Sequence, residues 1–464
     1  MKKPHNGTKS VQSGATCFKS MANLLFSHQQ LLHEKFLQTD LGKIYLAIPF
    51  DRLAATIPAP AHNKSGLGRK PWFNVKGGIA LQFLKHYLQL SDELLMQRIN
   101  TDWSMQLFCG ILLKADEKIR DTNLPSWWRT YIGKHLNIGD MQKELALHWK
   151  PFMHDTGVGM QDATCYESRI SFPTDVKLIW NCCHELYLLI QQQRRSLKLR
   201  KSRMNYQRQK EIFQSYQKTK KKTRRKEKKL RKKLLKFLLK LLQHLDDMQQ
   251  KYRLSLPGKQ QRKLLTVIKI YEQQHVKLYG QVKQIKNRIV SLSKPYIRPI
   301  IRGKETKTAE FGAKVNIVQV DGINFIEHLS YDAFNESTRF QHGIFLQRKL
   351  FGKCTHQSAD QIYATNINRK YCKQNNIVTN FIPKGKQKIQ HIQQAATLRR
   401  TLNIARGTIL EGSFGNEKNH YFLQKIPARN DITETCWIFF GIFTSNAVRM
   451  ADRIAIALQH SRAA

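Results

Sequence analysis

Three acidic residues, far apart in the chain, have the chemistry and the sequence surroundings to share one site. Asp162 lies in a strand-like stretch, Asp360 at the end of a second one, and Glu411 in a helical segment farther on. Carboxylate oxygens are the ligands that Mg²⁺ and Mn²⁺ prefer in proteins. Two such ions held a few ångströms apart can activate an attacking oxygen and stabilise the leaving oxygen of a phosphodiester. The three carboxylates are therefore candidates for one two-metal site.

Basic residues and glycines surround the glutamate. Lys418 follows Glu411 at a spacing of about two helical turns, which puts both side chains on one helix face, and Arg406 precedes it. Gly412 and Gly415 would let another backbone or a ligand approach closely. Beside a metal pair, Arg406 and Lys418 would bind phosphates. By themselves, however, these residues also fit an ordinary surface ion pair.

The composition indicates a polyanionic partner. The chain has 464 residues, 41% of them hydrophobic, which is enough for two or more cores. Lys and Arg total 79 against 33 for Asp and Glu, giving a formal charge of +46. Such a surface attracts polyanions and releases their counterions on binding. Nucleic acid is the first candidate; an anionic membrane surface is second, but the sequence has no acylation or prenylation motif.

Cysteine usage and hydropathy indicate the compartment. The eight cysteines include no CxxC pair, which favours reduced thiols and argues against a zinc site or a disulfide scaffold. The longest mostly apolar run, residues 436–447, is too short to span a bilayer. We therefore expect a cytoplasmic protein without a membrane partner.

The N-terminal third predicts a tail followed by helices. Residues 1–41 are a tail and lead-in that we expect to be partly disordered, and residues 42–150 are expected to form a helical domain. Within it, Ser91 before two acids is typical of a helix N-cap. Residues 151–175 form the first strand block, and Pro173 followed by Asp175 indicates the start of the next helix, with Asp175 as a cap.

Residues 176–303 predict a basic helical or coiled-coil insertion. Between residues 191 and 240 there are 22 Lys and Arg against two acids, and leucines then recur at helical spacing from residue 230. We expect a helical hairpin with a basic arm that contacts the phosphate backbone, or else a solvated helix face. The residues expected to contact DNA there are Arg224, Arg225, Lys228 and Lys229.

Residues 304–464 change to a mixed pattern. A strand-like run at 311–320, the turn dipeptide Asp321-Gly322 and a returning run at 324–330 predict a β-hairpin. Helices at 337–351 and 366–374, a strand at 377–382 and the helix that carries Glu411 follow. This order is typical of a mixed α/β sheet.

Three blocks of the chain resemble those of DDE transposases from bacterial insertion sequences, related to the insertion-sequence five family. They are Gln161-Asp-Ala-Thr with Ile170-Ser-Phe-Pro-Thr-Asp175, then Ala359-Asp-Gln-Ile-Tyr363, then Leu410-Glu-Gly-Ser-Phe-Gly-Asn-Glu-Lys418. Residues 68–135 are similar to the helical N-terminal domain of these elements, and the resemblance covers most of residues 68–450.

This resemblance implies a fold class, an activity and partners. The fold would be α/β, with an RNase H-like mixed-sheet catalytic core, and Asp162, Asp360 and Glu411 would be the catalytic metal ligands. The protein would bind terminal inverted repeats in double-stranded DNA, cleave at the element ends and join the 3′-OH to target DNA, as a homodimer or higher oligomer. Two features depart from the family pattern: residues 356–358 are polar, and Arg406 lies one position farther from the glutamate.

Other interpretations of the same residues remain open. The chain could be a non-catalytic or decayed basic nucleic-acid-binding protein, or a metal-dependent nuclease that cleaves without joining. Tyr363 could contact DNA or pack under the sheet. Glu310 and Glu336 are the substitute acids if the three carboxylates do not converge.

Overall fold

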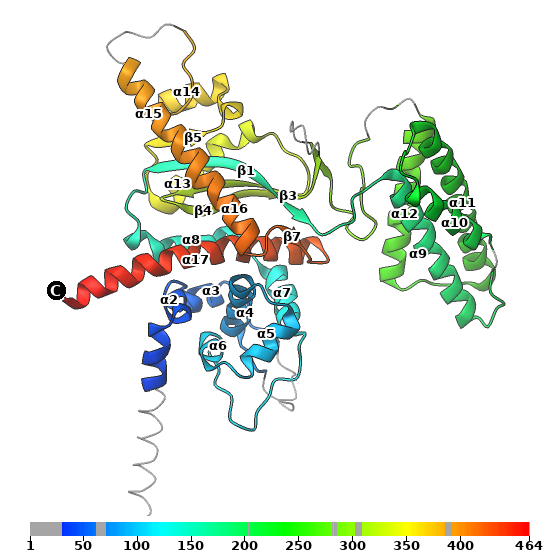
Figure 1. Cartoon of the computed structure of the whole chain (residues 1–464), viewed down its shortest axis with the longest axis horizontal. Helices are drawn as coiled ribbons and strands as arrows, with labels where there is room; N and C mark the ends of the chain where they lie inside the picture. The colour runs from blue at the N-terminus through cyan, green and yellow to red at the C-terminus, as the bar shows by residue number, and fades with distance from the viewer. Residues whose placement is uncertain are drawn as a thin grey trace, which may run out of the picture.

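A computed structural model gives the fold of the chain (Figure 1). It describes residues 30–61, 71–202, 204–280, 282, 285–301, 309–385 and 392–463. Most of the expected tail therefore lies outside the described residues. Residues 30–38 are helical, and the helices that follow them before the first strand are α2 (Asp40–Leu46), α3 (Phe50–Ala55), α4 (Val75–Leu88), α5 (Asp92–Ile99), α6 (Trp103–Phe108), α7 (Leu124–His135) and α8 (Ile138–Trp149). Ser91 caps α5 as predicted, accepting a hydrogen bond from the Leu94 backbone N–H.

A seven-stranded mixed sheet forms the centre of the molecule. Its strands are β1 (Val158–Ser168), β2 (Pro299–Ile301), β3 (Ala309–Val320), β4 (Ile323–Ser330), β5 (His356–Ala359), β6 (Val378–Thr379) and β7 (Lys425–Ile426). β3 pairs antiparallel with β1, β2 and β4, whereas β5 and β7 pair parallel with β1, and β6 parallel with β5. The mixed α/β class predicted from the sequence is confirmed.

The β3–β4 hairpin closes through the predicted turn. Asp321 and Gly322 both have positive φ, 49° and 79°. Two consecutive residues with positive φ characterise a type I′ turn, whose twist matches that of the flanking strands. The Arg453 guanidinium donates to the Asp321 carboxylate at 2.6 Å, which ties this turn to the last helix.

Helices cover both faces of the sheet. They are α13 (Phe340–Phe351), α14 (Asn366–Gln374), α15 (Ile392–Ala405), α16 (Glu411–His420) and α17 (Asp431–Ala463). Gln161 of β1 donates to the Arg339 carbonyl just before α13, whereas Tyr166 of β1 donates to Glu417 of α16. Because alternate strand residues point to opposite faces, α13 and α16 lie on opposite sides of β1.

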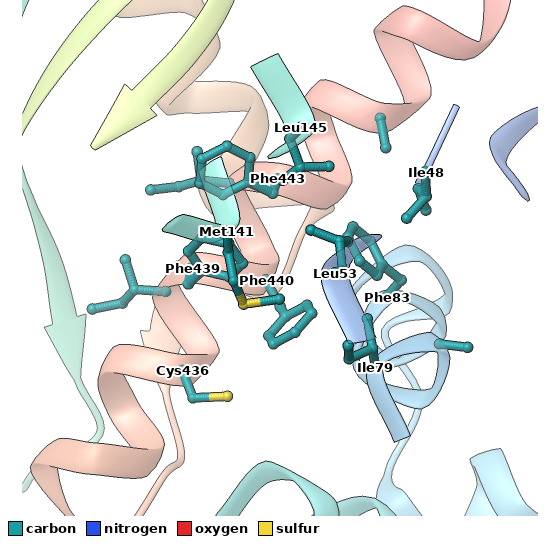
Figure 2. Close-up of a cluster of buried hydrophobic side chains, with 14 of the residues drawn as sticks. Ile48, Leu53, Ile79, Phe83, Met141, Leu145, Cys436, Phe439, Phe440 and Phe443 are labelled. Carbon is teal, nitrogen blue, oxygen red and sulfur yellow. The ribbon is translucent and has the colours of Figure 1, made fainter. Parts of the chain in front are cut away.

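The N-terminal helices share one hydrophobic core with α17 and the sheet. In Figure 2, apolar side chains of α3, α4 and α8 face the buried side of α17. Phe83 of α4 packs edge-to-face on Phe440 of α17, with ring centroids 5.2 Å apart. The ring centroids of Phe325 of β4 and Phe443 of α17 are 6.4 Å apart. The helices before residue 150 therefore complete their core with a helix almost three hundred residues later in the chain.

The insertion is a four-helix bundle with its own core. Its helices are α9 (Asp175–Ser196), α10 (Tyr206–Lys218), α11 (Arg224–Tyr252) and α12 (Gly258–Tyr279). Leucines of α11, including Leu234 and Leu238, are fully buried against α9 and α12. Figure 1 shows this bundle projecting from the sheet, joined to it by the segments after β1 and before β2. The helical insertion is thus present, with four helices where the sequence indicated a hairpin.

Asp175 corrects one sequence interpretation. Thr174 caps α9, accepting from the Lys177 backbone N–H, while the Asp175 side chain turns inward. It accepts hydrogen bonds from Lys277 at 2.6 Å and from Arg288 at 2.9 Å. Asp175 therefore fastens the start of α9 to α12 and to the segment after α12.

None of the described helices combines the length and the apolar character that crossing a bilayer requires.

Candidate active site

Two of the three candidate acids meet at one arginine. The Arg406 Nη1 donates to Asp162 Oδ2 at 2.7 Å and to Glu411 Oε1 at 3.0 Å. Asp162 comes from the middle of β1 and Glu411 from the first turn of α16, so these contacts join residues 244 positions apart. The Asp162 and Arg406 side chains are 16% and 18% exposed, whereas Glu411 is 52% exposed and borders the solvent.

A π-helical turn sets the spacing of Arg406 and Glu411. Residues Arg406–Leu410 form a π-helix between α15 and α16, and the Glu411 backbone N–H donates to the Arg406 carbonyl. In this i→i+5 arrangement, residues five apart lie one above the other. The wider turn therefore lets Arg406, five positions before Glu411, lie beside it and bond to its carboxylate. Such π-bulges occur frequently at functional sites.

Asp360 lies on the neighbouring strand. β1 and β5 are parallel, with Gln161 opposite Ala359, so Asp162 and Asp360 follow that pair side by side on one face. Neighbouring strands are about 4.8 Å apart. The Asp360 side chain caps the short 3₁₀ helix η3 (Gln361–Tyr363), accepting from the Gln361 N–H at 2.6 Å. Asp360 is thus the neighbour of Asp162 across the β1–β5 pair, while Arg406 joins Asp162 to Glu411.

The polar strand before Asp360 has a packing role. Gln357 and Ser358 are fully buried, and the Ser358 hydroxyl donates to the Leu402 carbonyl of α15 at 3.0 Å. Asn380 donates to the Asn403 side chain of the same helix at 2.6 Å. These bonds hold α15 against β5 and so bring Arg406, at its C-terminal end, to the acids. An apolar side chain at position 358 would not supply the first of these bonds.

The environment of Asp162 favours a positive charge. Burial raises the pKa of its carboxyl to about 6, although the Ala163 backbone N–H and Arg406 act in the opposite direction. The charges of Glu336 and Asp360 also raise that pKa. Glu336, a substitute acid, lies in the 3₁₀ helix η2 (Glu336–Arg339) and pairs with Lys314 at 2.7 Å. Glu310 lies in β3, opposite Ile300 of β2.

Lys418 lines the same face of β1. Its ammonium donates to the Thr164 hydroxyl at 2.9 Å and lies 5.7 Å from the centre of the Tyr166 ring. Thr164 is two residues after Asp162 and so points to the same side of the sheet. The predicted glutamate–lysine pairing on one helix face therefore puts a cation within reach of any phosphate bound at the acids.

Glu417 is a functional candidate that sequence reasoning missed. This carboxyl is fully buried beneath α16, where it accepts from the Tyr166 hydroxyl and from the Asn324 amide of β4, the latter at 2.6 Å. Burial raises its pKa to about 7. The contacts fix the rotation of α16 and hence the direction of Glu411 and Lys418. A charged residue beside Lys418 gave no sign in the sequence that it would be buried.

The glycines of α16 face open space. A Cβ atom added at Gly412 or Gly415 would have no described atom within 4 Å. The expected close approach of another protein backbone is therefore absent from the described part of the chain, and this helix surface is left clear for a ligand.

Tyr363 requires a correction. Its side chain is fully buried and its hydroxyl donates to Asn316 of β3 at 2.9 Å. It packs under the sheet and does not reach DNA, which is the alternative that the sequence left open. By contrast, Arg224, Arg225, Lys228 and Lys229 are all exposed at the start of α11.

The fit to a metal depends on Arg406. Among the described residues, no three His, Cys, Asp or Glu side chains are gathered closely enough to hold an ion. Asp162 and Glu411 instead share the Arg406 guanidinium. The donor set, hard carboxylate oxygens from three elements, suits Mg²⁺ or Mn²⁺, but the arginine must move away before an ion can take its place.

Comparisons with protein-family models, with curated proteins and with solved structures give no match to this chain.

Proposed function

We propose that the protein is a DNA transposase that cleaves DNA at the ends of a mobile element and joins the 3′-OH to target DNA. The observation that carries the proposal is that Asp162 and Glu411 share the Arg406 guanidinium, with Asp360 on the strand beside Asp162, in a chain of charge +46. Acids gathered against a cation on a strongly basic protein fit phosphodiester chemistry better than a purely structural role.

The strand order supports an RNase H-like core. An antiparallel run of three strands, β4–β3–β1, continues on the other side of β1 with the parallel strands β5 and β6. That order is the one expected for an RNase H-like sheet, in which the first strand lies at the centre and carries the first acid. Asp162 lies on that central strand and Asp360 directly after its parallel neighbour.

Each group of the chain has a role in this mechanism. Asp162, Asp360 and Glu411 would hold Mg²⁺ or Mn²⁺, which, when bound, polarises the attacking and leaving oxygens of the scissile phosphodiester. Arg406 and Lys418 would contact the phosphates on either side and orient them for in-line attack. Glu417 would keep α16 at the rotation that directs Glu411 and Lys418 to this face.

The other parts of the chain would bind and assemble DNA. The exposed residues Arg224, Arg225, Lys228 and Lys229 would neutralise backbone phosphates of double-stranded DNA. The helices before β1 would recognise the terminal inverted repeats or form the contact of a homodimer or higher oligomer. A cytoplasmic, nucleoid-associated location follows from such a partner.

One assay separates this proposal from its alternatives. Paired inverted repeats are first identified in the DNA that flanks the gene. A duplex that ends in such a repeat with a free 3′-OH is then incubated with the protein, Mg²⁺ and a plasmid. A joined product supports the transposase. Nicked plasmid without joined product supports a nuclease, and bound but unchanged DNA supports a non-catalytic binding protein, for which the Arg406 ion pairs would be a permanent structural feature.

A further inference from the structure

Arg406 occupies the place that a metal ion would need. One atom, Nη1, contacts an oxygen of Asp162 at 2.7 Å and an oxygen of Glu411 at 3.0 Å. These two oxygens therefore lie no farther apart than the two distances together. Oxygens on opposite sides of Mg²⁺ are separated by about 4.2 Å, twice the usual metal–oxygen distance of 2.1 Å. A small closure of the two carboxylates around an ion would replace the guanidinium nitrogen.

The guanidinium is incompletely bonded where it lies. Its Nε is buried and has no hydrogen-bond partner among the described residues. An unsatisfied buried donor costs about 1–3 kcal/mol, so this position is not the best one available to the side chain. The surface of α16 beyond it, at Gly412 and Gly415, is open to a ligand. A phosphate bound there would offer the guanidinium a full bidentate partner.

We propose that Arg406 acts as a surrogate cation in the DNA-free protein, so that metal binding is weak until a DNA phosphate draws the arginine away. This inference rests on the proposed function, since it assigns a regulatory role within the same site. The π-helical turn allows this role, because it places Arg406 next to Glu411 and directs the guanidinium to Asp162. By linkage, a DNA phosphate that binds Arg406 tightens metal binding, and the metal tightens DNA binding by the same factor.

The test measures Mn²⁺ binding without DNA, by titration calorimetry or by the electron paramagnetic resonance signal of free Mn²⁺. Arg406→Ala is expected to bind Mn²⁺ at least about tenfold more tightly than the wild type, because the competing charge is gone. Arg400→Ala, which removes an exposed arginine of α15, is the matched control and should stay within about twofold of the wild type. Arg406→Gln serves as a second variant if alanine disturbs the π-helical turn.

Two further outcomes are decisive. If Arg406→Ala and Arg406→Gln bind Mn²⁺ no more tightly than Arg400→Ala, the surrogate-cation role is wrong, while joined products in the plasmid assay would leave the transposase proposal intact. If no variant binds Mn²⁺ even with duplex DNA, both proposals fail. In the supporting case, adding a short duplex tightens Mn²⁺ binding by a larger factor in the wild type than in Arg406→Ala.

Discussion

The insertion and the candidate site each contain a partly buried charge cluster, and the two have opposite compositions. In the insertion one acid, Asp175, is surrounded by Lys277, Arg288 and Arg231 at 2.6, 2.9 and 3.6 Å. At the candidate site one base, Arg406, lies between two acids. Both clusters join segments distant in sequence.

The pKa shifts of the two aspartates express this difference. Burial raises the pKa of Asp175, but its hydrogen bonds and ion pairs, chiefly with Lys277, outweigh burial and lower that pKa to about 2. At Asp162, burial prevails over a single arginine and raises the pKa to about 6. An acid saturated with cations acts as a structural clasp, whereas an acid cluster short of positive charge can accept a further cation. The predictions below test this distinction.

The largest effect, a loss of DNA strand cleavage, is expected for substitutions of the acids at the candidate site. Asp360→Asn and Glu411→Gln should each lower the rate of DNA strand cleavage by at least about a thousandfold, because an amide is a poor ligand for Mg²⁺. Cleavage of end-labelled duplex measures the rate, and DNA affinity should change little. Glu93→Gln, at an exposed helix acid of α5, is the control. Wild-type cleavage by either site variant would show that the site is wrongly assigned.

Removing the Asp175 carboxylate, the structural clasp of the insertion, should lower its stability. Asp175→Asn leaves three cations without their shared partner, so we expect a loss of about 3–5 kcal/mol in the free energy of unfolding of the insertion. Urea denaturation followed by circular dichroism measures this loss. Asp247→Asn changes an exposed acid of α11 and should be nearly neutral. Equal stability of the two variants would mean that Asp175 is not a clasp.

Glu417 is expected to make the stability of the folded protein depend on pH. Its folded pKa of about 7 lies above the ordinary value of 4.5, so its contribution to stability is complete below pH 4.5 and is lost as pH rises to 7. The loss should be on the order of 3 kcal/mol. Glu417→Gln should remove this share of the pH dependence, while the share from Asp162, whose pKa is also raised, remains; thermal melts at pH 4.5, 6 and 8 measure both. A melting profile that keeps the wild-type pH dependence in the variant would exclude Glu417 as its source.

The smallest effect concerns the basic arm of the insertion. Replacing Arg224, Arg225, Lys228 and Lys229 together by Gln should weaken DNA binding by roughly tenfold at moderate salt. The slope of log affinity against log salt should fall by up to about 3.6, since each phosphate contact contributes about 0.9. Fluorescence anisotropy over a salt series measures both. An unchanged slope in a variant that melts like the wild type would remove this arm from the DNA interface.

Local chemistry made much of the fold predictable. The Asp321-Gly322 turn follows from the need for positive φ at two successive residues, and Pro173 indicated the start of α9, although its cap is Thr174 and not Asp175 as predicted. The strand at 377–382 was overestimated, since only Val378 and Thr379 pair with β5. The apolar run there predicts a strand but not how much of it finds a partner.

Long-range pairing is what the sequence could not reveal. The α17 side chains that complete the N-terminal core follow no local pattern linking them to α4. The number of helices in the insertion was missed because α10 is strongly polar on average and none of its residues is fully buried. The three acids were predicted to share a site from their residue types and from a family resemblance. That Arg406 bridges two of them depends on a π-helical turn that spacing alone does not predict.

Cleavage of the polypeptide by bound iron tests the central claim most directly. Fe²⁺ added to the protein with duplex DNA, ascorbate and peroxide should replace Mg²⁺ and cut the backbone within reach of its own position. The account predicts fragments ending near residues 162, 360 and 411, suppressed by excess Mg²⁺ and missing in Asp360→Asn. Fragments that end elsewhere, or cuts that Mg²⁺ does not suppress, would contradict it.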